Sequence, residues 1–291
     1  MSFSLPALMG QLFIGAINGA FYALLSLGLA IIFGLLNIIN FAQGAFYMLG
    51  AFLAFLLLEY LGIGYWIAIF LSPLLVGGFG MLVERTLIRH IYNLDHLYGF
   101  LLTLGIALAI EGALAIQFGA SGQPYGVPEA LQGGVNLGFM YLPYYRCWVV
   151  VVSIVLCLAT YWAIERTKLG SYLRAATENP RLVQAFGIDV PKLITVTYGA
   201  GVALAAFAGV LSGVINQVSP QMGVNLIVVV FAVVVIGGLG SIMGAVVTGF
   251  ALGIIEGLTR YLYPEASNSV VFVIMAIVLL VKPAGLFGKT A

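Results

Sequence analysis

Nine apolar segments constrain the fold of this sequence more than any other feature. They lie near residues 8–34, 41–61, 64–83, 98–118, 146–164, 193–215, 224–238, 242–258 and 269–281, and a segment of about 20 apolar residues crosses the roughly 30 Å hydrocarbon layer of a bilayer. Only 7% of the 291 residues are charged, against about 25% in soluble domains. We therefore predict an all-α, polytopic membrane helix bundle of eight to ten spans, in one domain over residues 1–291. The last three segments are short, which allows tilted, broken or re-entrant pieces.

The basic residues predict how the bundle is oriented. No lysine or arginine precedes Arg85, so no basic region of a cleavable signal peptide is evident. With nine spans, nine basic residues fall on one face and only Arg146 and Arg260 on the other. Because lysine and arginine are retained on the cytoplasmic side, we expect a cytoplasmic C-terminus and an outside N-terminus. Aromatic residues at the outer span ends fit an interfacial belt: Tyr60, Tyr65, Trp66, Tyr144, Tyr145, Trp148, Tyr261 and Tyr263.

Uncharged polar residues separate the first two apolar segments, in the stretch GLLNIINFAQGAFYMLGAF at residues 34–52. Asn37, Asn40 and Gln43 recur every third residue, which places three amides on one helical face. Beside glycines, this pattern favours a broken helix that lines a polar path. The alternative is an ordinary helix end capped by Asn40. The topology places Asn37 and Asn40 at the cytoplasmic ends of the spans, as candidates for an inner gate; if residues 41–61 were re-entrant, this stretch would lie at the outer face.

Two carboxylates, Glu111 and Glu256, fall inside or at the edge of apolar segments. A charge at the bilayer centre costs about 2.5–3.5 kcal/mol, so such residues normally face a cavity or a partner. Thr103 and Thr248 precede them by eight residues, and both glutamates lie in an Ile-Glu-Gly triplet, a pattern that an internal repeat would produce. We expect Glu111 to face a cavity and Glu256 to be solvated near the outer end. The candidate path or gate residues are Asn18, Asn37, Asn40, Gln43, Thr103, Glu111 and Glu256.

Small residues recur every fourth position in three of the apolar segments. Such stripes let helix backbones approach closely in lipid, where helix association depends on packing. We therefore predict tight helix contacts, within this chain or with a partner chain. The stripes are Gly15, Gly19 and Ala23; Gly201, Ala205, Gly209 and Gly213; and Ala245, Gly249, Gly253 and Gly257.

The longest polar connection on the predicted cytoplasmic side covers residues 165–192 and has room for two short helices. In the second, Asn179 is the expected N-cap, Pro180 the first helical residue and Gly187 the stop. An apolar stripe follows the same helix: Leu182, Val183 and Phe186. We predict that it docks into a groove on a soluble partner; the alternative is a helix lying on the membrane surface. The candidate coupling residues are Arg174, Glu178, Asn179, Pro180, Leu182, Phe186 and Gly187.

Several classes of function have no support in the residues. No serine or cysteine nucleophile has a plausible histidine partner, so an enzyme is not expected. His90 and His96 have no carboxylate cluster near them, so no metal site is predicted. Cys147 and Cys157 lie about 15 Å apart along one helix, too far for a disulfide, and are expected to be apolar fillers. A net charge of +1 without a basic patch excludes nucleic acid.

Four motifs, in order along nearly the whole chain, resemble those of permease subunits of branched-chain amino acid ABC transporters of the LivH type. They are LLNIINFAQGAFYMLGAF at 35–52, ERTKLGSYLRAATENPRLVQAFGI at 165–188, GGLGSIMGAVVTGFALGIIEGL at 237–258 and KPAGLFG at 282–288. The resemblance implies the inner membrane of a bacterium and four kinds of contact: a second permease, two cytoplasmic ATPase subunits that hold ATP and Mg, an external solute-binding protein, and lipid. It implies no cofactor in this chain, and it implies that residues 165–192 contact the ATPase.

This chain departs from the resembled family at one point. Family members commonly have His-Gly-Glu where this chain has Gln43, Gly44 and Ala45, which argues against a proton relay there. The expected function is that of an ATP-driven importer of branched-chain or other hydrophobic amino acids, working by alternating access. Alternatives are a permease for urea or short amides, an ion-coupled secondary transporter that uses Glu111 and Glu256, and a passive channel.

Overall fold

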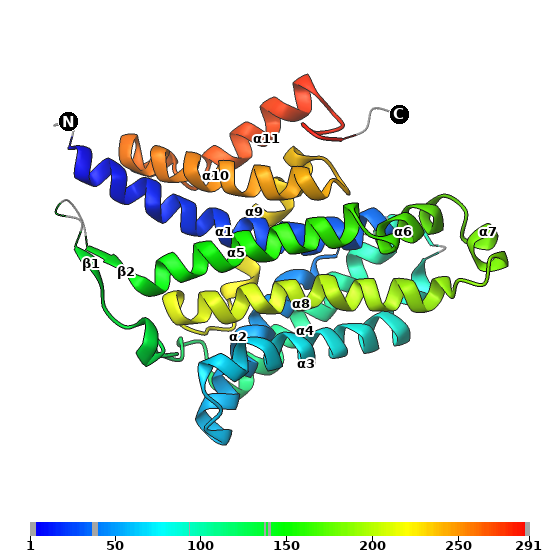
Figure 1. Ribbon diagram of the computed structural model, residues 1–291, viewed down its shortest axis with the longest axis horizontal. Coiled ribbons are helices and arrows are strands. Elements are labelled where there is room, and N and C mark those ends of the chain that lie inside the picture. The colour runs from blue at the N-terminus through cyan, green and yellow to red at the C-terminus, as the bar shows by residue number, and fades with distance from the viewer. Residues whose placement is uncertain (1–3, 37–39, 93, 137, 139–140, 289–291) are drawn as a thin grey trace.

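The computed structural model describes residues 4–36, 40–92, 94–136, 138 and 141–288 (Figure 1). Within these ranges nine apolar helices cover the nine predicted segments, and the remaining elements are short. The apolar helices are α1 (Leu5–Leu36), α2 (Ala42–Leu61), α3 (Tyr65–Thr86), α4 (His96–Phe118), α5 (Tyr144–Glu165), α8 (Val190–Asn216), α9 (Met222–Gly237), α10 (Ile242–Leu262) and α11 (Val270–Val281). The prediction of a helical polytopic bundle is confirmed.

Helix length separates seven of these helices from the other two. Among the described residues, seven helices are long and apolar enough to cross a membrane, whereas α9 has 16 residues and α11 has 12. At 1.5 Å per residue, α9 is about 24 Å long and α11 about 18 Å, less than the roughly 30 Å hydrocarbon layer. The expectation of short pieces is confirmed for α9 and α11. It is wrong for α10, whose 21 residues continue to Leu262, where Arg260 is paired with Glu256 one turn earlier.

The two ends of the bundle differ in what they carry (Figure 1). The first described residues of α1 lie at one end with an antiparallel hairpin of β1 (Gly134–Asn136) and β2 (Tyr141–Pro143), in which Val135 pairs with Leu142. We call this the hairpin end. The opposite end carries α6 (Lys168–Glu178) and α7 (Pro180–Ala185), and we call it the α7 end. Short 3-10 helices complete the described connections: η1 (Ile88–Ile91), η2 (Glu129–Leu131) and η3 (Pro264–Ala266).

The aromatic residues of the predicted belt divide into an exposed and a buried set. Tyr60 and Tyr263 are exposed, as an interfacial belt requires. Tyr65 and Tyr145 are instead buried, with their hydroxyl oxygens 3.2 Å apart, and the Tyr145 hydroxyl donates to the Leu211 carbonyl at 2.9 Å. Part of the predicted belt is therefore a hydrogen-bonded piece of the core.

Glycine backbones hold α1 against α10 along a line that we call the seam: Gly15, Gly19 and Ala23 on α1, and Ala245, Gly249, Gly253 and Gly257 on α10. A Cβ on Gly15 would lie 2.5 Å from the Gly253 carbonyl oxygen, and one on Gly249 would lie 2.6 Å from the Ala23 nitrogen. A side chain at these positions would collide with backbone. The predicted tight contacts are confirmed, and they lie within this chain.

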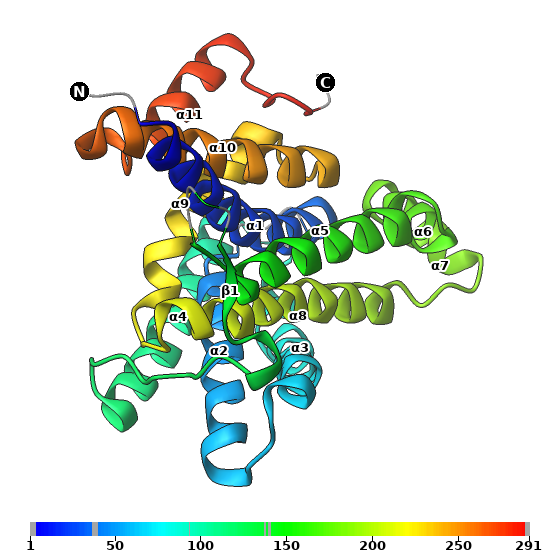
Figure 2. The same cartoon turned by 60° about the vertical axis from the view of Figure 1, so that its left-hand side comes forward.

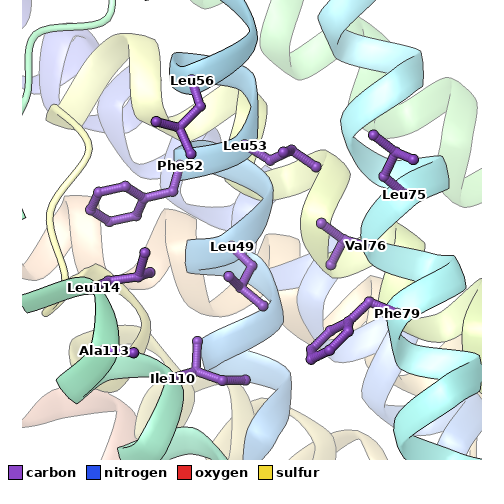
Figure 3. A pocket seen from close by; sticks show the side chains of 10 residues that line it. All are labelled: Leu49, Phe52, Leu53, Leu56, Leu75, Val76, Phe79, Ile110, Ala113 and Leu114. Carbon is purple, nitrogen blue, oxygen red and sulfur yellow. The ribbon is translucent and has the colours of Figure 1, made fainter. Parts of the chain in front are cut away.

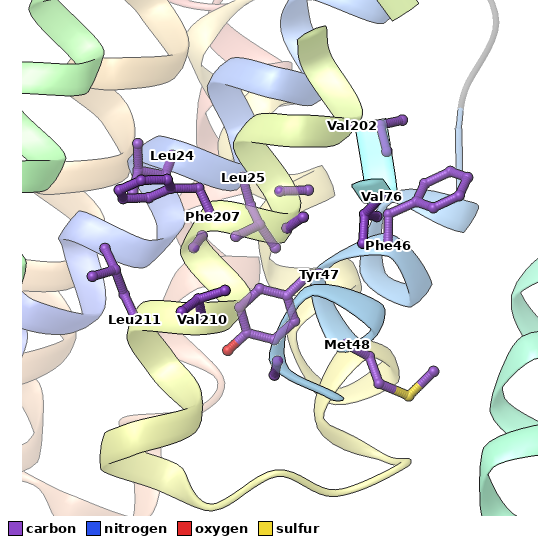
Figure 4. Close-up of a cluster of buried hydrophobic side chains, with 14 of the residues drawn as sticks. Leu24, Leu25, Phe46, Tyr47, Met48, Val76, Val202, Phe207, Val210 and Leu211 are labelled. Carbon is purple, nitrogen blue, oxygen red and sulfur yellow. The ribbon is translucent and has the colours of Figure 1, made fainter. Parts of the chain in front are cut away.

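The stripe of small residues on α8, which includes Gly209 and Gly213, lies at the centre of the bundle. Gly209 meets the backbone of Tyr47, and a Cβ on Gly50 would lie 2.5 Å from the Cα of Ala206. These contacts place α2 directly on α8, and Figure 2 shows α2 between α4 on one side and α8 and α3 on the other. The apolar core closes around this crossing (Figure 4); its side chains include Leu24, Phe46, Tyr47, Val76, Phe207 and Leu211.

Residues near the C-terminus complete the end of α9. The backbone N–H groups of Leu286 and Phe287 donate to the carbonyls of Ile236 and Gly237 at 2.8 and 3.1 Å. These are the last two residues of α9, whose carbonyls no later turn of the helix satisfies. Elsewhere, Cys147 and Cys157 are free thiols, and Cys157 is buried among apolar neighbours, as expected of a filler.

Candidate functional site

Three of the predicted path residues meet where α2 begins, in a cluster that we call the α2 joint: Asn40, Gln43, Thr103, Tyr198 and Gly201. The Asn40 Nδ2 donates to the Tyr198 hydroxyl at 3.0 Å, and the Gln43 Nε2 donates to the Gly201 carbonyl at 3.0 Å. The Thr103 hydroxyl accepts from the backbone N–H of Phe41 at 3.2 Å. The joint therefore ties the start of α2 to both α4 and α8.

Asn40 also starts the helix that follows it. Its Oδ1 accepts from the Ala42 N–H at 3.1 Å, and its carbonyl accepts from the Gln43 N–H at 3.3 Å. A side-chain oxygen that accepts from the first turn satisfies donors that have no partner within the helix. The expectation that Asn40 is the N-cap is wrong by one residue: the N-cap of α2 is Phe41, which makes no side-chain cap bond, and Asn40 bonds the first turn from the position before it. Asn37 lies outside the described residues.

The α2 joint lies deeper in the bundle than the helix end at which the topology placed it. Tyr198 and Gly201 are the ninth and twelfth residues of α8, so they lie about 12 and 16 Å along its axis. The short α9 also begins beside the joint: a Cβ on Gly44 would lie 2.6 Å from the Gly223 carbonyl oxygen. Two helices therefore begin inside the bundle. That the amides line a polar path stays a prediction.

The side chains of the joint are shielded from solvent. Asn40 is 1% exposed, and Gln43 and Thr103 are 0% exposed. Gln43 Oε1 has no hydrogen-bond partner among the described residues. A buried acceptor without a donor costs about 1–3 kcal/mol, so this oxygen favours any arrangement that brings a donor to it.

The other predicted path residues lie elsewhere. Glu256 is 6% exposed and accepts from the Tyr22 hydroxyl at 2.6 Å and from Arg260 Nη2 at 2.7 Å. The expectation that it is solvated is wrong, because both of its oxygens are occupied beside the seam. Asn18 is half-buried on α1. Glu111 is half-buried on α4 and has no hydrogen bond or ion pair within the described residues.

An apolar cavity of about 340 Å³ opens between α2, α3 and α4 (Figure 3). It lies next to Ile110, the residue before Glu111, but no predicted amide lines it. This cavity can accommodate an aliphatic group and offers it no side-chain hydrogen bond. Its lining residues are Leu49, Phe52, Leu53, Leu56, Leu75, Val76, Phe79, Ile110, Ala113 and Leu114.

The predicted coupling helix is present as α7. Asn179 Oδ1 accepts from the Leu182 N–H at 3.0 Å, and Pro180 is the first helical residue. Gly187, at φ +82°, ends the helix, and its N–H donates to the Gln184 carbonyl at 2.9 Å. A positive φ favours glycine at this position. Cap, start and stop are confirmed.

The apolar stripe predicted along α7 divides between two faces. Leu182 and Phe186 are 54% and 77% exposed, whereas Val183 is buried against Ala176 and Val190. Residues four apart share a helical face, and the residue next to the first is turned by about 100°. A three-residue docking stripe is therefore wrong: Val183 anchors α7 to α6 and α8, and only Leu182 and Phe186 face outward.

The remaining coupling candidates lie on α6. The Arg174 guanidinium pairs with Glu165 at the end of α5, at 3.2 Å, with both side chains largely exposed. An exposed pair of this kind contributes at most about 1 kcal/mol. Glu178, the last residue of α6, is exposed beside Asn179.

Sequence reasoning missed one buried carboxylate. Glu84, near the end of α3, is buried and accepts from the hydroxyls of Tyr92 and Thr195, the latter at 2.6 Å. Glu84 lies at the end of an apolar segment, directly before Arg85. A carboxylate at such a position is the sequence feature that could have pointed to a buried polar contact. Among the described residues, no group of three or more histidine, cysteine, aspartate or glutamate side chains is arranged to hold a metal ion.

Comparison with known proteins adds an independent result. A family model described as "Branched-chain amino acid transport system / permease component" matches residues 11–281. The high-affinity branched-chain amino acid transport system permease protein LivH of Escherichia coli (strain K12) is 28% identical, with 96% of this chain and 95% of the relative covered. No solved structure matches this chain.

Two further relatives extend the similarity. The probable branched-chain amino acid transport permease protein LivH of Methanocaldococcus jannaschii is 31% identical, with 91% of this chain and 88% of the relative covered. The high-affinity branched-chain amino acid transport system permease protein LivM of Escherichia coli (strain K12) is 25% identical, with 92% of this chain and 68% of the relative covered. The family match includes all or most of each of the nine apolar helices. The chain therefore belongs to the family of permease components of branched-chain amino acid transport systems.

Proposed function

We propose that this chain forms the translocation path of an ATP-driven importer for branched-chain or other hydrophobic amino acids. The family match over residues 11–281 is the observation that carries this proposal. The importer would contain a second permease, two ATPase subunits that bind ATP and Mg, and an external solute-binding protein. Similarity to both LivH and LivM supports a pair of related permeases.

The same proposal assigns the α7 end to the cytoplasm and the N-terminus to the outside. Arg85 and Arg89 line one cavity with Lys192 near the start of α8, and further basic residues lie on α6 and α7. Basic residues are retained on the cytoplasmic side. Residues 165–192 then face the ATPase subunits. In this orientation the α2 joint lies in the cytoplasmic half of the bundle, as an inner gate would.

A continuous set of contacts connects α7 to the α2 joint. Val183 of α7 packs against Val190, the first residue of α8. Tyr198 and Gly201 of the same helix hold Asn40 and Gln43. In the proposed mechanism, ATPase closure moves α7 through Leu182 and Phe186, α8 moves with it, and the start of α2 changes its hydrogen-bond partners. Alternating access would follow from this change.

An ATP-driven mechanism also agrees with the state of the carboxylates. Both oxygens of Glu256 are engaged by Tyr22 and Arg260, so this group is poorly suited to exchange a coupling ion. The apolar cavity between α2, α3 and α4 suits an aliphatic side chain better than urea or a short amide.

Replacing Phe186 by aspartate tests the mechanism. Leucine uptake into proteoliposomes that contain the binding protein and the ATPase subunits should fall at least about ten-fold, a loss equivalent to about 1.4 kcal/mol, because the exposed apolar contact is lost. Phe186→Tyr is the matched control and should retain most of the uptake. Co-purification with the ATPase subunits separates failed assembly from failed coupling. Unchanged uptake and assembly in Phe186→Asp would rule out a docking role for this residue.

A further inference from the structure

A second cavity, of about 840 Å³, lies toward the α7 end between α3 and α8. Three cationic side chains line it, Arg85, Arg89 and Lys192, together with one carboxylate, that of Asp189. Three positive charges against one negative charge leave a formal net charge of +2. Asp189 and Lys192 belong to residues 165–192, but none of the α2 joint residues and neither Leu182 nor Phe186 lines this cavity.

The cations of this cavity are available to a ligand. None of the three forms an ion pair within the described part of the chain. The nearby carboxylates are already engaged: Asp189 Oδ1 accepts from the Lys192 backbone N–H at 3.0 Å, and Glu84 is bonded to Tyr92 and Thr195. An anion that enters the cavity would therefore meet three cations that form no ion pair in the described part of the chain, beside a single lining carboxylate, Asp189.

Buried contacts hold the two walls of the cavity at a fixed distance. A Cβ on Gly77 of α3 would lie 3.0 Å from the Gly199 carbonyl oxygen of α8, and Glu84 of α3 accepts from Thr195 of α8. Burial and the adjacent Glu84 carboxylate raise the pKa of Tyr92 above its usual value, so its hydroxyl remains a donor to Glu84. Arg85, near the end of α3, thus lies beside a helix pair that is held together by buried contacts.

Another part of the lining is apolar. Gly78, Leu82 and Val196 belong to the membrane-length helices α3 and α8, and the last two side chains are exposed. A free phosphate ion would use only the cationic part of the cavity. A phosphate group joined to a hydrocarbon chain would use both parts, and basic pockets between transmembrane helices are known to take lipid head groups.

We propose that this cavity binds an anionic phospholipid, with its phosphate at Arg85, Arg89 and Lys192 and an acyl chain along Leu82 and Val196. The bound lipid would reduce the net charge between α3 and α8 and cover their exposed apolar side chains. This site does not depend on which amino acid is transported.

Native mass spectrometry of the purified full-length chain tests the proposal, with dioctanoyl phosphatidylglycerol and dioctanoyl phosphatidylcholine as probes. The chain should bind the anionic lipid in preference to the zwitterionic one. In Arg85→Gln/Arg89→Gln, affinity for phosphatidylglycerol should fall about 25-fold, about five-fold for each charge removed. The matched control, Arg166→Gln/Arg181→Gln, removes two exposed cations toward the same end that do not line the cavity, and it should bind as the parent chain does.

Further arms separate the sources of phosphate. Leu82→Ser/Val196→Ser should weaken lipid binding and leave any binding of inorganic phosphate unchanged. Thermal unfolding of each variant identifies misfolded protein, and the single variant Lys192→Gln replaces a double variant that fails to fold. Equal losses in the cavity and control variants, equal binding of the two lipids, or inorganic phosphate bound as tightly as phosphatidylglycerol would overturn the proposal. Displacement of the lipid by added ATPase subunits would also overturn it, because the cations would then belong to a protein interface.

Discussion

The seam and the α2 joint are both buried helix contacts, but they are built from opposite kinds of residue. At the seam, glycines bring the backbones of α1 and α10 together with no side chain between them. At the joint, side-chain amides and hydroxyls connect α2 to α4 and α8. Close backbone packing has one favourable arrangement and loses contact whenever the helices separate. Hydrogen-bonding groups can exchange partners. We infer that the seam maintains the fold, whereas the joint is where the fold can change.

The largest effect is expected at the seam. In Gly253→Leu the new side chain would start 2.5 Å from the Gly15 carbonyl oxygen and closer still to the Gly19 backbone. We expect a destabilisation of at least about 3 kcal/mol, measured as a lower midpoint of thermal unfolding in detergent. Gly112→Leu is the matched control, since a Cβ on Gly112 of α4 meets nothing within 4 Å. If the two variants unfold at the same temperature, the seam does not hold the bundle together.

A pair of tyrosine variants compares the two regions directly. Tyr198→Phe removes the acceptor of Asn40 at the joint, and Tyr22→Phe removes a donor to Glu256 beside the seam. Each leaves one buried polar atom without its partner, Asn40 Nδ2 or Glu256 Oε2, at a cost of about 1–3 kcal/mol. We expect similar losses of thermal stability.

Substrate uptake at saturating ATP should fall only in Tyr198→Phe, because only this bond belongs to the proposed path from α7. Uptake that falls equally in both variants, after correction for the amount of folded protein, would remove the distinction between the two regions.

The smallest effect on stability is expected for Gln43→Met. This change removes the hydrogen bond to Gly201 and also removes the Oε1 that has no partner. The two effects oppose each other, so the change in unfolding free energy should stay below about 1 kcal/mol. Uptake should nevertheless fall, because the amide can no longer exchange partners. Uptake at the parent rate would show that Gln43 serves packing alone.

The sequence predicted the helices better than it predicted how they meet. Apolar length and small-residue spacing were sufficient for nine helices and for the seam, since both depend on local pattern. The burial of Val183 was missed because it depends on Ala176 and Val190, which come from neighbouring elements. Glu84 was missed because its partners, Tyr92 and Thr195, become neighbours only when α3 packs on α8.

At the candidate site too, features that depend on local sequence were predicted and features that depend on distant residues were not. The amide pattern at residues 37–43 pointed to the start of α2, and Asn40, Gln43 and Thr103 do meet there. Their depth in the bundle could not be predicted, because it depends on Tyr198 and Gly201 of α8, almost 160 residues later in the chain. Glu256 was expected to be solvated because its hydrogen bond to Tyr22, 234 residues earlier, has no trace in local sequence.

The contact of Leu286 and Phe287 with the end of α9 has a consequence for biosynthesis. The carbonyls of Ile236 and Gly237 are made fifty residues before the N–H groups that bond them. A nascent chain inserted up to α11 therefore carries an open helix end, with two unsatisfied acceptors, until the KPAGLFG segment has been translated. The end of α9 is thereby completed only when residues 282–288 have been made. A product truncated before Leu286 would keep that open end.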